Sequence, residues 1–375
     1  MSDRERTDAV DFDFSLPAIP LTPAHARHLV GLDIGSHSIK LAELKPGRNG
    51  WTLIGLNRVN LSPEVIVEGV IINEAAVIEA INTLFEGAKT RTKQVAISLG
   101  GNAVIVKRVT MPRMSFEDLE RNIEVEAAEH IPFPMDEVNV DFEIMGDDPD
   151  EPDRMIVYLV AAKKDMINEL TGVLLSCGLK AAVLDVDVFT VGNVFEVNYP
   201  ELLQEPVALV NIGASVTNIN LVRDGKSLFV RDITRGGYEI TEEIQRALGV
   251  SFDEAEMFKR GGGDDQADSL IPEEVGEILR NSSIQLARDI QRSLDYFAQT
   301  GGTERVSRLF ISGGMSLVNG MDRIIEEETG IAVEILNPFR KIAIDEKRVD
   351  PMVVEREGAM YAVSVGLGIR RAFDK

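Results

Sequence analysis

The chain has 375 residues and a formal net charge of −23, with 44% hydrophobic and 27% charged residues. This size permits two domains or one large fold with subdomains, and the composition is that of a folded globular protein. So much negative charge argues against nucleic acid and against direct binding to anionic membrane surfaces. We expect neither a secretory signal nor a membrane span, because no apolar run has the length either requires. The single cysteine suits a reducing compartment, so we expect a cytoplasmic protein.

The first part of the chain is predicted to be irregular. Residues 1–28 carry three prolines among aspartates without helical or strand periodicity, which predicts a flexible acidic extension. Residues 30–44, "VGLDIGSHSIKLAEL", run from an apolar segment through a glycine turn into an alternating strand. With the strand at 51–61 they predict a hairpin. Its turn is predicted to contain Pro46, Gly47, Asn49 and Gly50.

The next segment alternates between helical and strand patterns. A helix is predicted over residues 73–88 and a buried strand over 94–100. From residue 104 the pattern becomes strand, helix, strand, strand, helix, and the first of these helices is predicted to begin at the N-cap Ser115. Its inward face is predicted to contain Phe116, Leu119, Ile123 and Ala127. Prolines end it, and the remaining elements are predicted at 138–146, 155–163 and 164–178.

The second half repeats a pattern of the first. "NIGASVTNINLV" at 211–222 has the same shape as "DIGSHSIKLAEL" at 33–44, and more than 170 residues separate them, which predicts a duplicated domain. A helical region is predicted at 236–305, with a long helix at 272–299. "GAMYAVSVGLGIRR", at 358–371, is apolar on nearly all sides and predicts a buried helix.

The glycine turns indicate a ligand. A glycine turn after a buried strand lets the backbone approach a ligand closely and directs N–H groups toward a phosphate. A single turn of this kind is also ordinary hairpin chemistry. Two matched copies and a third turn, "SGGM" at 312–315, favour a phosphate chain held from both sides and a base lying against the third turn.

These three segments resemble the first phosphate, second phosphate and adenosine motifs of the actin-like ATPase superfamily. "RNIEVEAAEHIPFPMDEV" at 121–138, "GGYEITEEIQRALGVSFDEAEMFKR" at 236–260 and the ending "YAVSVGLGIRR" are similar to the PilM family of type IV pilus assembly proteins, relatives of the cell-division protein FtsA. The resemblance covers about residues 29–372. It implies an α/β fold of duplicated actin-like ATPase (ribonuclease H-like) domains with an inserted SHS2-like α+β subdomain.

The resemblance also implies a division into subdomains. The core subdomain 1A would comprise residues 29–103 and 181–205, and the inserted subdomain 1C would comprise residues 104–180. Subdomain 2A would comprise residues 206–240 and 306–350, and the helical subdomain 2B residues 241–305. Residues 351–375 would form a C-terminal helix that returns to subdomain 1A.

ATP or ADP with Mg²⁺ is the cofactor that the resemblance implies. Asp33 would be the carboxylate on the side of the first phosphate loop that faces the metal. Lys40 stands seven residues later, which is the spacing at which actin places the lysine that contacts phosphate. Glu256 and Lys259 would flank the ribose and adenine. The residues implied to form the nucleotide site are Asp33, Gly35, Ser36, His37, Ser38, Lys40, Asn211, Gly213, Ala214, Ser215, Thr217, Glu256, Lys259, Gly313, Gly314 and Met315.

Simpler interpretations of these residues remain open from sequence. Lys40 could be an exposed strand residue, and Glu256 with Lys259 could be an ordinary surface pair three residues apart on a helix. Gly313 and Gly314 could be only a tight strand-to-helix turn.

One position departs from the superfamily pattern. The second phosphate loop of hydrolysing members begins with an aspartate, and actin carries another three residues later; here the two positions are Asn211 and Ala214. An amide supplies neither the negative charge that holds hydrated Mg²⁺ nor a base that accepts a proton from water. The sequence therefore predicts nucleotide binding with slow or absent hydrolysis.

The PilM resemblance implies a cytoplasmic scaffold at the inner membrane that captures the N-terminal tail of the membrane protein PilN and contacts the pilus motor ATPase. The tail would lie in a groove between the core and the inserted subdomain at about 104–180. One alternative is an FtsA-like polymerising ATPase, although the chain ends at "GIRRAFDK" without the amphipathic membrane helix of that family. Another is a sugar kinase on the same fold, which would need an aspartate near Asn211.

Overall fold

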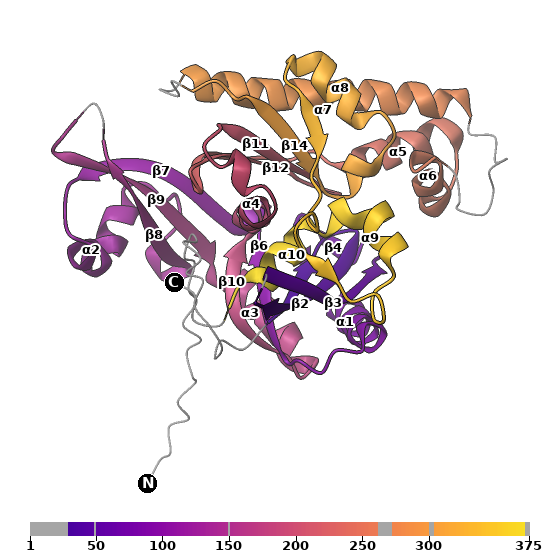
Figure 1. Ribbon diagram of the computed structural model, residues 1–375, viewed down its shortest axis with the longest axis horizontal. Helices are drawn as coiled ribbons and strands as arrows, with labels where there is room; N and C mark the ends of the chain where they lie inside the picture. Colours follow the sequence, from indigo (N-terminus) through magenta and orange to yellow (C-terminus); the bar gives the residue numbers. More distant parts are fainter. Residues whose placement is uncertain (1–28, 49, 149–150, 262–271, 300–303, 372–375) are drawn as a thin grey trace, which may run out of the picture.

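The computed structural model describes residues 29–48, 50–148, 151–261, 272–299 and 304–371 (Figure 1). The predicted flexible extension at 1–28 lies outside the described residues. Two mixed sheets and a smaller three-stranded sheet form the framework.

The first large sheet has the strand order β10-β6-β1-β2-β3-β16. Its strands are β1 (Val30–Ile34), β2 (Ser38–Gly47), β3 (Gly50–Asn60), β6 (Gln94–Leu99), β10 (Lys180–Val186) and β16 (Ala343–Ile344). The second large sheet has the order β13-β12-β11-β14-β15. Its strands are β11 (Val207–Ile212), β12 (Thr217–Arg223), β13 (Lys226–Ile233), β14 (Arg308–Ser312) and β15 (Val333–Ile335).

The two large sheets share one topology. Strands β3, β2, β1, β6 and β10 correspond in order to β13, β12, β11, β14 and β15; in each set the first two pairings are antiparallel and the last two parallel. β1 and β11 are central and mostly buried, which explains their continuous apolar sequences. The sequence repeat at 33–44 and 211–222 therefore occupies the same two strands of each sheet.

Two buried helices cross between the halves (Figure 1). α4 (Asp187–Asn198) follows β10, and α10 (Ala362–Ile369) returns from the C-terminal part to pack on α4, β1 and β2. All eight residues of α10 are buried, as its apolar sequence predicts.

The inserted sheet has the order β7-β9-β8 and its own small core against helix α2. These elements are β7 (Val104–Pro112), α2 (Phe116–Ala128), β8 (Val138–Asp147) and β9 (Arg154–Lys163). The predicted N-cap is confirmed, since the Ser115 side chain accepts a hydrogen bond from the Asp118 N–H. Leu119 and Ala127 are buried, but the prediction for Phe116 is wrong: it is 54% exposed at the first turn, beside the ring of Phe142.

Two further elements differ from the simplest sequence interpretation. The β2–β3 ladder continues to the pair Gly47 and Gly50, so Pro46, Gly47 and Gly50 belong to the strands instead of the predicted turn, and Asn49 lies outside the described residues. α3 (Lys164–Ser176) packs with α1 (Glu74–Ala88) in the core of the first sheet. The subdomain boundaries themselves stay a prediction.

The second sheet is covered by helices. They are α5 (Gly237–Leu248), α6 (Phe252–Lys259), α7 (Glu273–Gln299) and α8 (Met321–Thr329), while α9 (Pro351–Glu357) precedes α10. α7 coincides with the long helix predicted at 272–299 and buries Val275, Leu286 and Ile290. Within the described ranges, none of the helices combines the length and apolar character that crossing a membrane requires.

Candidate functional site

The two repeated glycine turns have the same backbone geometry. The Gly35 N–H donates to the carbonyl of Ser38 over 3.3 Å, and the Gly213 N–H donates to the carbonyl of Val216 over 3.0 Å. Each turn joins the first two antiparallel strands of its sheet. The loops between these bonds are partly exposed, so their remaining backbone N–H groups can face a ligand.

Asp33 and Lys40 form an ion pair beside the first loop. They are cross-strand partners in β1 and β2, and Lys40 Nζ donates to Asp33 Oδ2 over 2.9 Å. Their side chains are 13% and 14% exposed. Lys40 is therefore a mostly buried partner of Asp33. The alternative interpretation of Lys40 as an exposed strand residue is ruled out.

The same position of the second sheet carries a neutral amide pair. Asn211 and Asn218 are cross-strand partners, and Asn211 Nδ2 donates to Asn218 Oδ1 over 3.3 Å. Asn211 Oδ1 accepts from Ser312 Oγ, while Asn218 Nδ2 donates to Asp232 Oδ1 over 2.8 Å. The repeat thus preserves the register of the Asp33–Lys40 pair while removing both of its charges.

A second carboxylate near Asp33 was missed by the sequence analysis. Asp187 begins α4 at the carboxyl end of β10, with its side chain against Gly100. Burial and the neighbouring charge of Asp33 raise the pKa of Asp187 to about 7, with a further contribution from Asp232. The signal available in the sequence was its place directly after a buried parallel strand, where α/β folds bind ligands.

Protein ligands alone do not form a metal site in the part of the chain that the structure describes. No group of three or more His, Cys, Asp or Glu side chains is placed to hold a metal there. Mg²⁺ is commonly bound through one or two carboxylates, water and substrate phosphates. Asp33 and Asp187 fit that mode of binding, in which the nucleotide completes the coordination.

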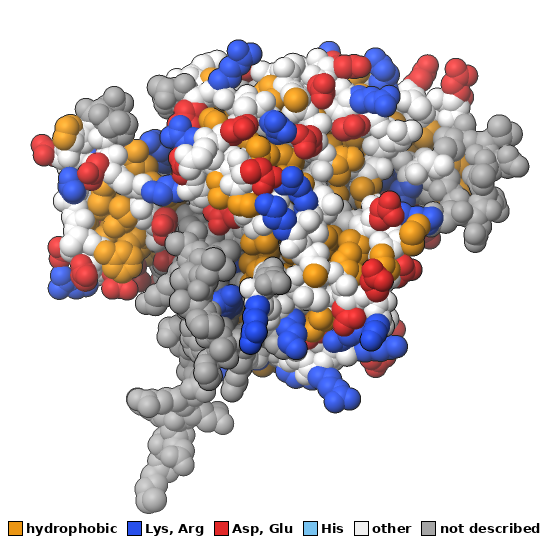
Figure 2. Space-filling view, viewed as in Figure 1, with side chains coloured by type: hydrophobic (Ala, Val, Ile, Leu, Met, Phe, Trp, Pro, Cys, Tyr) orange, Lys and Arg blue, Asp and Glu red, His pale blue; other side chains and the backbone are white. Residues whose placement is uncertain are grey.

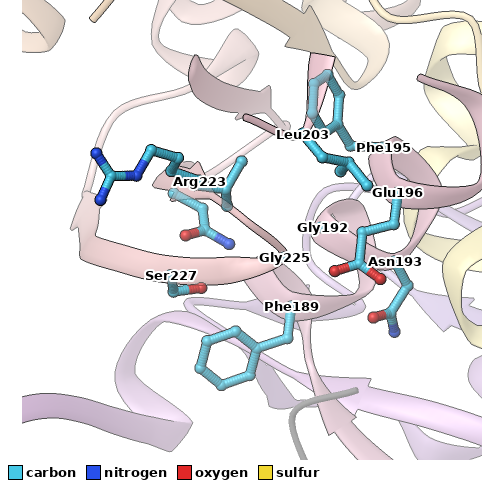
Figure 3. A pocket seen from close by; sticks show the side chains of 11 residues that line it. Phe189, Gly192, Asn193, Phe195, Glu196, Leu203, Arg223, Gly225 and Ser227 are labelled. Carbon is cyan, nitrogen blue, oxygen red and sulfur yellow. The ribbon is translucent and has the colours of Figure 1, made fainter. Parts of the chain in front are cut away.

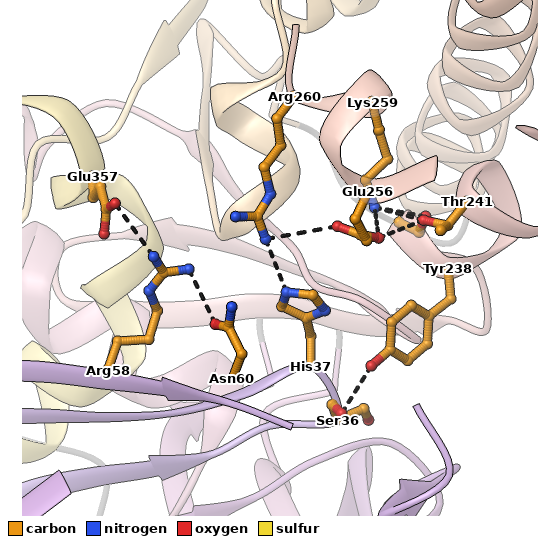
Figure 4. A network of polar contacts seen from close by, with 11 residues as sticks. Ser36, His37, Arg58, Asn60, Tyr238, Thr241, Glu256, Lys259, Arg260 and Glu357 are labelled. Carbon is orange, nitrogen blue, oxygen red and sulfur yellow. Dashed lines mark hydrogen bonds and ion pairs between the residues drawn. The ribbon is translucent and has the colours of Figure 1, made fainter. Parts of the chain in front are cut away.

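Glu256 and Lys259 form a buried pair, so the ordinary surface pair is ruled out. Each residue is 7% exposed. Lys259 Nζ donates to Glu256 Oε1, to Thr241 Oγ1 over 2.8 Å and to the Gly237 carbonyl over 3.1 Å (Figure 4). Burial alone would raise the pKa of Glu256, but the charge and hydrogen bond of Lys259 lower it; burial lowers the pKa of Lys259.

Two side chains of the second half reach across to the first loop (Figure 4). Tyr238 Oη donates to the Ser36 carbonyl over 2.9 Å, and the Tyr238 N–H donates to the Ala214 carbonyl over 2.8 Å, so this residue contacts both glycine loops. Arg260 Nη2 lies 2.9 Å from His37 Nε2 and 3.6 Å from Glu256 Oε2. The structure therefore brings the first loop, the second loop and the Glu256–Lys259 pair together.

His37 is neutral in this arrangement. Burial lowers its pKa to about 4; Glu256 opposes the shift, while the charges of Arg260, Lys259 and Lys40 reinforce it. A neutral imidazole can accept a hydrogen bond from the Arg260 guanidinium at Nε2. His37 is thus an acceptor within the bridge, in keeping with a loop residue instead of an acid–base catalyst.

We expect His37 to make the folded state sensitive to acid. Its folded pKa lies below the usual histidine value of 6.5, so the unfolded chain binds the proton more readily and stability falls as pH decreases from 6.5 to about 4. The loss should be about 2–3 kcal/mol and should be absent from His37→Gln, which keeps an acceptor for Arg260. Urea unfolding at several pH values measures it, and identical pH profiles for the two proteins would contradict the prediction.

The third glycine turn lies beside the second loop. Gly313 has φ = 85°, a conformation that favours glycine, and an added Cβ would clash with the Ile212 carbonyl. Gly314 is exposed, whereas Met315 is 3% exposed and its sulfur packs against Gly237. Only the backbone of this turn is thus available to a ligand.

The remaining predicted residues divide by exposure. Ser38 and Thr217 are buried, and Thr217 Oγ1 donates to the Arg235 carbonyl. Ala214 and Ser215 are partly exposed in the second loop. The buried side chains of Ser38 and Thr217 are therefore not exposed to a ligand.

Comparison with known proteins decides the family. The model of the family described as type IV pilus assembly protein PilM matches residues 31–372. The chain belongs to this PilM family. It is a type IV pilus assembly protein with the actin-like ATPase fold. The solved structure of a PilM-PilN type IV pilus biogenesis complex is 28% identical, has a TM-score of 0.82, and covers 92% of this chain and 99% of that one.

Other relatives are more distant. Cell division protein FtsA of Bacillus subtilis is 23% identical over 272 residues, which are 66% of this chain and 61% of FtsA. The ethanolamine utilization protein EutJ of Carboxydothermus hydrogenoformans has a TM-score of 0.55 at 14% identity, covering 93% of this chain and 91% of EutJ, and shares the fold. FtsA is thus a distant relative of this PilM family member.

Proposed function

We propose that this PilM family protein is a nucleotide-bound cytoplasmic scaffold of the type IV pilus machine, held at the inner membrane by the N-terminal tail of PilN and coupled to the motor ATPase. The observation that carries the proposal is the pair of matched glycine loops joined by Tyr238. Phosphate bound between these loops would contact both halves of the chain. Bound nucleotide would thereby favour one relative orientation of the halves.

In this proposal the nucleotide occupies the residues singled out from the sequence. The N–H groups of the two loops hold phosphates, Asp33 is on the metal side, and the exposed backbone at Gly314 lies against the adenosine. Mg²⁺ supplies charge neutralisation for the phosphates when it is bound. Asn211 cannot act as a base toward water, which supports retention of ATP or ADP with slow or absent hydrolysis.

We expect purified protein to retain nucleotide and to release phosphate from Mg²⁺-ATP very slowly. Asn211→Asp restores a carboxylate that can still accept a hydrogen bond from Ser312 Oγ, although it loses the donor that Asn218 Oδ1 accepts from, and it should raise turnover by about 10²-fold. Chromatography of released nucleotide and a phosphate-release assay measure both quantities, with Asn211→Ala as control. A folded sample without nucleotide would overturn the site, and fast turnover by the natural chain would overturn the slow-hydrolysis proposal.

The PilN tail is proposed to lie along the inserted sheet. Tyr158 on β9 has Arg108 and Glu143 as its cross-strand partners, on the face opposite to α2. Its side chain is 2% exposed, and its hydroxyl has no hydrogen-bond partner among the described residues. Burial raises the pKa values of Tyr158 and Glu143. The hydroxyl is covered in the free protein, so a main-chain carbonyl of an extended peptide between this sheet and the core would satisfy it only after the covering side chains move aside.

Tyr158→Phe is expected to change stability and binding in opposite directions. Removing an unpaired buried hydroxyl should stabilise the free protein by about 1 kcal/mol, and losing one hydrogen bond to the peptide should weaken binding about fivefold. Urea unfolding and calorimetric titration with a synthetic PilN tail measure the two effects. Tyr296→Phe, at a half-exposed tyrosine on α7, is the control. A more stable variant with unchanged affinity would place the peptide elsewhere.

A further inference from the structure

A small pocket lies away from the nucleotide loops, between α4 and the hairpin of β12 and β13 (Figure 3). Its free volume is about 20 Å³, enough for one water molecule or a group of similar size. Phe189, Asn193 and Glu196 line it from α4, and Asn220 and Ser227 line it from the strands. None of these residues takes part in the site described above.

The inner wall of the pocket contains unpaired amide groups. Asn193 is 1% exposed, and neither its Nδ2 nor its Oδ1 has a hydrogen-bond partner in the described part of the chain. Asn220 donates to the Val188 carbonyl over 3.1 Å, but its Oδ1 is unpaired. Buried polar atoms are nearly always hydrogen-bonded in native proteins, so these atoms indicate a bound group.

The carboxylate of Glu196 closes the pocket on the helix side (Figure 3). Its oxygen lies against Gly225, where an added Cβ would collide with it. No described lysine or arginine forms an ion pair with Glu196, and burial raises its pKa to about 7. The nearest lining cation, Arg223, is engaged by Asp224 and Glu304. A partly buried carboxylate without a countercharge is unfavourable, and a cation would relieve it.

We propose that this pocket binds a primary ammonium group, supplied by a lysine side chain of a basic partner segment. The three N–H donors of an ammonium match three oxygen acceptors, namely the Glu196 carboxylate, Asn193 Oδ1 and Asn220 Oδ1, while the donor Asn193 Nδ2 keeps no partner in this arrangement. An ammonium head is about as large as water, whereas a guanidinium exceeds the free volume. The ring of Phe189 adds an attractive surface for a cation.

Charge decides against other occupants. An anion would meet Glu196 without a positive side chain to receive it, and a water molecule would satisfy the amides but leave the carboxylate without a countercharge. The net charge of −23 also attracts basic segments to the protein surface, where Figure 2 shows acidic side chains interspersed with basic ones. This inference concerns a partner contact that is independent of nucleotide and of the peptide proposed to lie near Tyr158.

Titration of the full chain with methylammonium chloride tests the pocket, at pH 8 so that Glu196 is ionised and at ionic strength held constant with KCl. We expect saturable binding by calorimetry and none with tetramethylammonium, which has no N–H donor. Glu196→Gln should weaken binding about 10-fold or more, because a charge-assisted hydrogen bond is lost. Glu201→Gln is the matched control, since Glu201 pairs with Arg340 and Lys341 outside the pocket. No saturation, or equal binding by Glu196→Gln, would overturn the proposal.

Two further arms examine the source of the ammonium and guard against misfolding. Nα-acetyl-lysine methylamide should bind, and its Nε-acetylated analogue should not; binding of methylammonium alone would overturn the partner lysine. In the natural chain, ¹³C NMR of the glutamate carboxyls should show that methylammonium lowers the pKa of Glu196. An unchanged Glu196 titration in saturating methylammonium would also overturn the proposal.

Discussion

Glu256→Gln is expected to destabilise the protein by about 3–5 kcal/mol, because it leaves the ammonium of Lys259 buried without a countercharge. Thr241 and the Gly237 carbonyl still accept hydrogen bonds from Lys259, but neither carries a negative charge. The midpoint and slope of urea unfolding measure the change. The same variant should weaken nucleotide binding, since Arg260, which contacts His37 in the first loop, loses the Glu256 carboxylate.

Glu254→Gln on the same helix is the matched control. Glu254 is exposed and closes a capping box with Ser251, so its replacement should cost about 1 kcal/mol or less. The double variant Glu256→Gln with Lys259→Met removes both charges and should recover much of the lost stability. Equal effects of Glu254→Gln and Glu256→Gln would mean that the Glu256–Lys259 pair is solvated, contrary to its burial.

The sequence predicted the local features of the site because they depend on short segments. The repeated glycine turns lie at the same strand ends, and the spacing of seven residues from Asp33 to Lys40 became a cross-strand pair. Register in an antiparallel hairpin follows from alternation and turn length, so such a pair can be inferred without a structure. The buried C-terminal helix was also predictable from a short segment. A helix that is apolar on all sides is stable only when protein covers every side of it.

Long-range contacts were beyond the sequence. The bridge from Arg260 to His37 joins residues 223 positions apart, and the raised pKa of Asp187 depends on burial and on Asp33 from another strand. The burial of Glu256 and Lys259 could not be predicted from their spacing. Residues three apart lie on the same face of a helix whether that face is buried or exposed to solvent. Helical periodicity predicted an inward face for α2 but not how deeply its first turn is covered, so Phe116, which lies against Phe142 of β8, was wrongly expected to be buried.

The two halves of the site differ in charge in a way that fits a scaffold. Asp33 and Lys40 put an ion pair under the first loop, while Asn211 and Asn218 put a neutral pair under the second. The neutral pair still anchors Ser312 and Asp232, so the local geometry is held by hydrogen bonds alone. A loop that keeps its shape without a carboxylate can hold a phosphate and lacks a base to activate water.

Gly366→Ala is expected to destabilise the protein by about 3 kcal/mol. Gly366 lies in α10 against α4, and an added Cβ would overlap the backbone carbonyl of Thr190. Backbone atoms cannot move aside as a flexible side chain can, so the two buried helices must separate, and overpacking of this kind is costly. Because α4 and α10 cross between the two large sheets, their separation should also loosen the nucleotide site.

Gly276→Ala provides a control in which the same substitution should have the opposite sign. Gly276 is exposed in α7, and a Cβ there meets no atom within 4 Å. Alanine has the higher helix propensity, so this variant should be stabilised by about 0.5–1 kcal/mol. Urea unfolding of the two variants measures the two changes in stability, and the nucleotide retained by each purified variant is quantified alongside. If Gly366→Ala is as stable as the natural chain, the close packing of α10 on α4 does not set the geometry between the halves, and other contacts such as the Tyr238 and Arg260 bridges must hold the proposed nucleotide site.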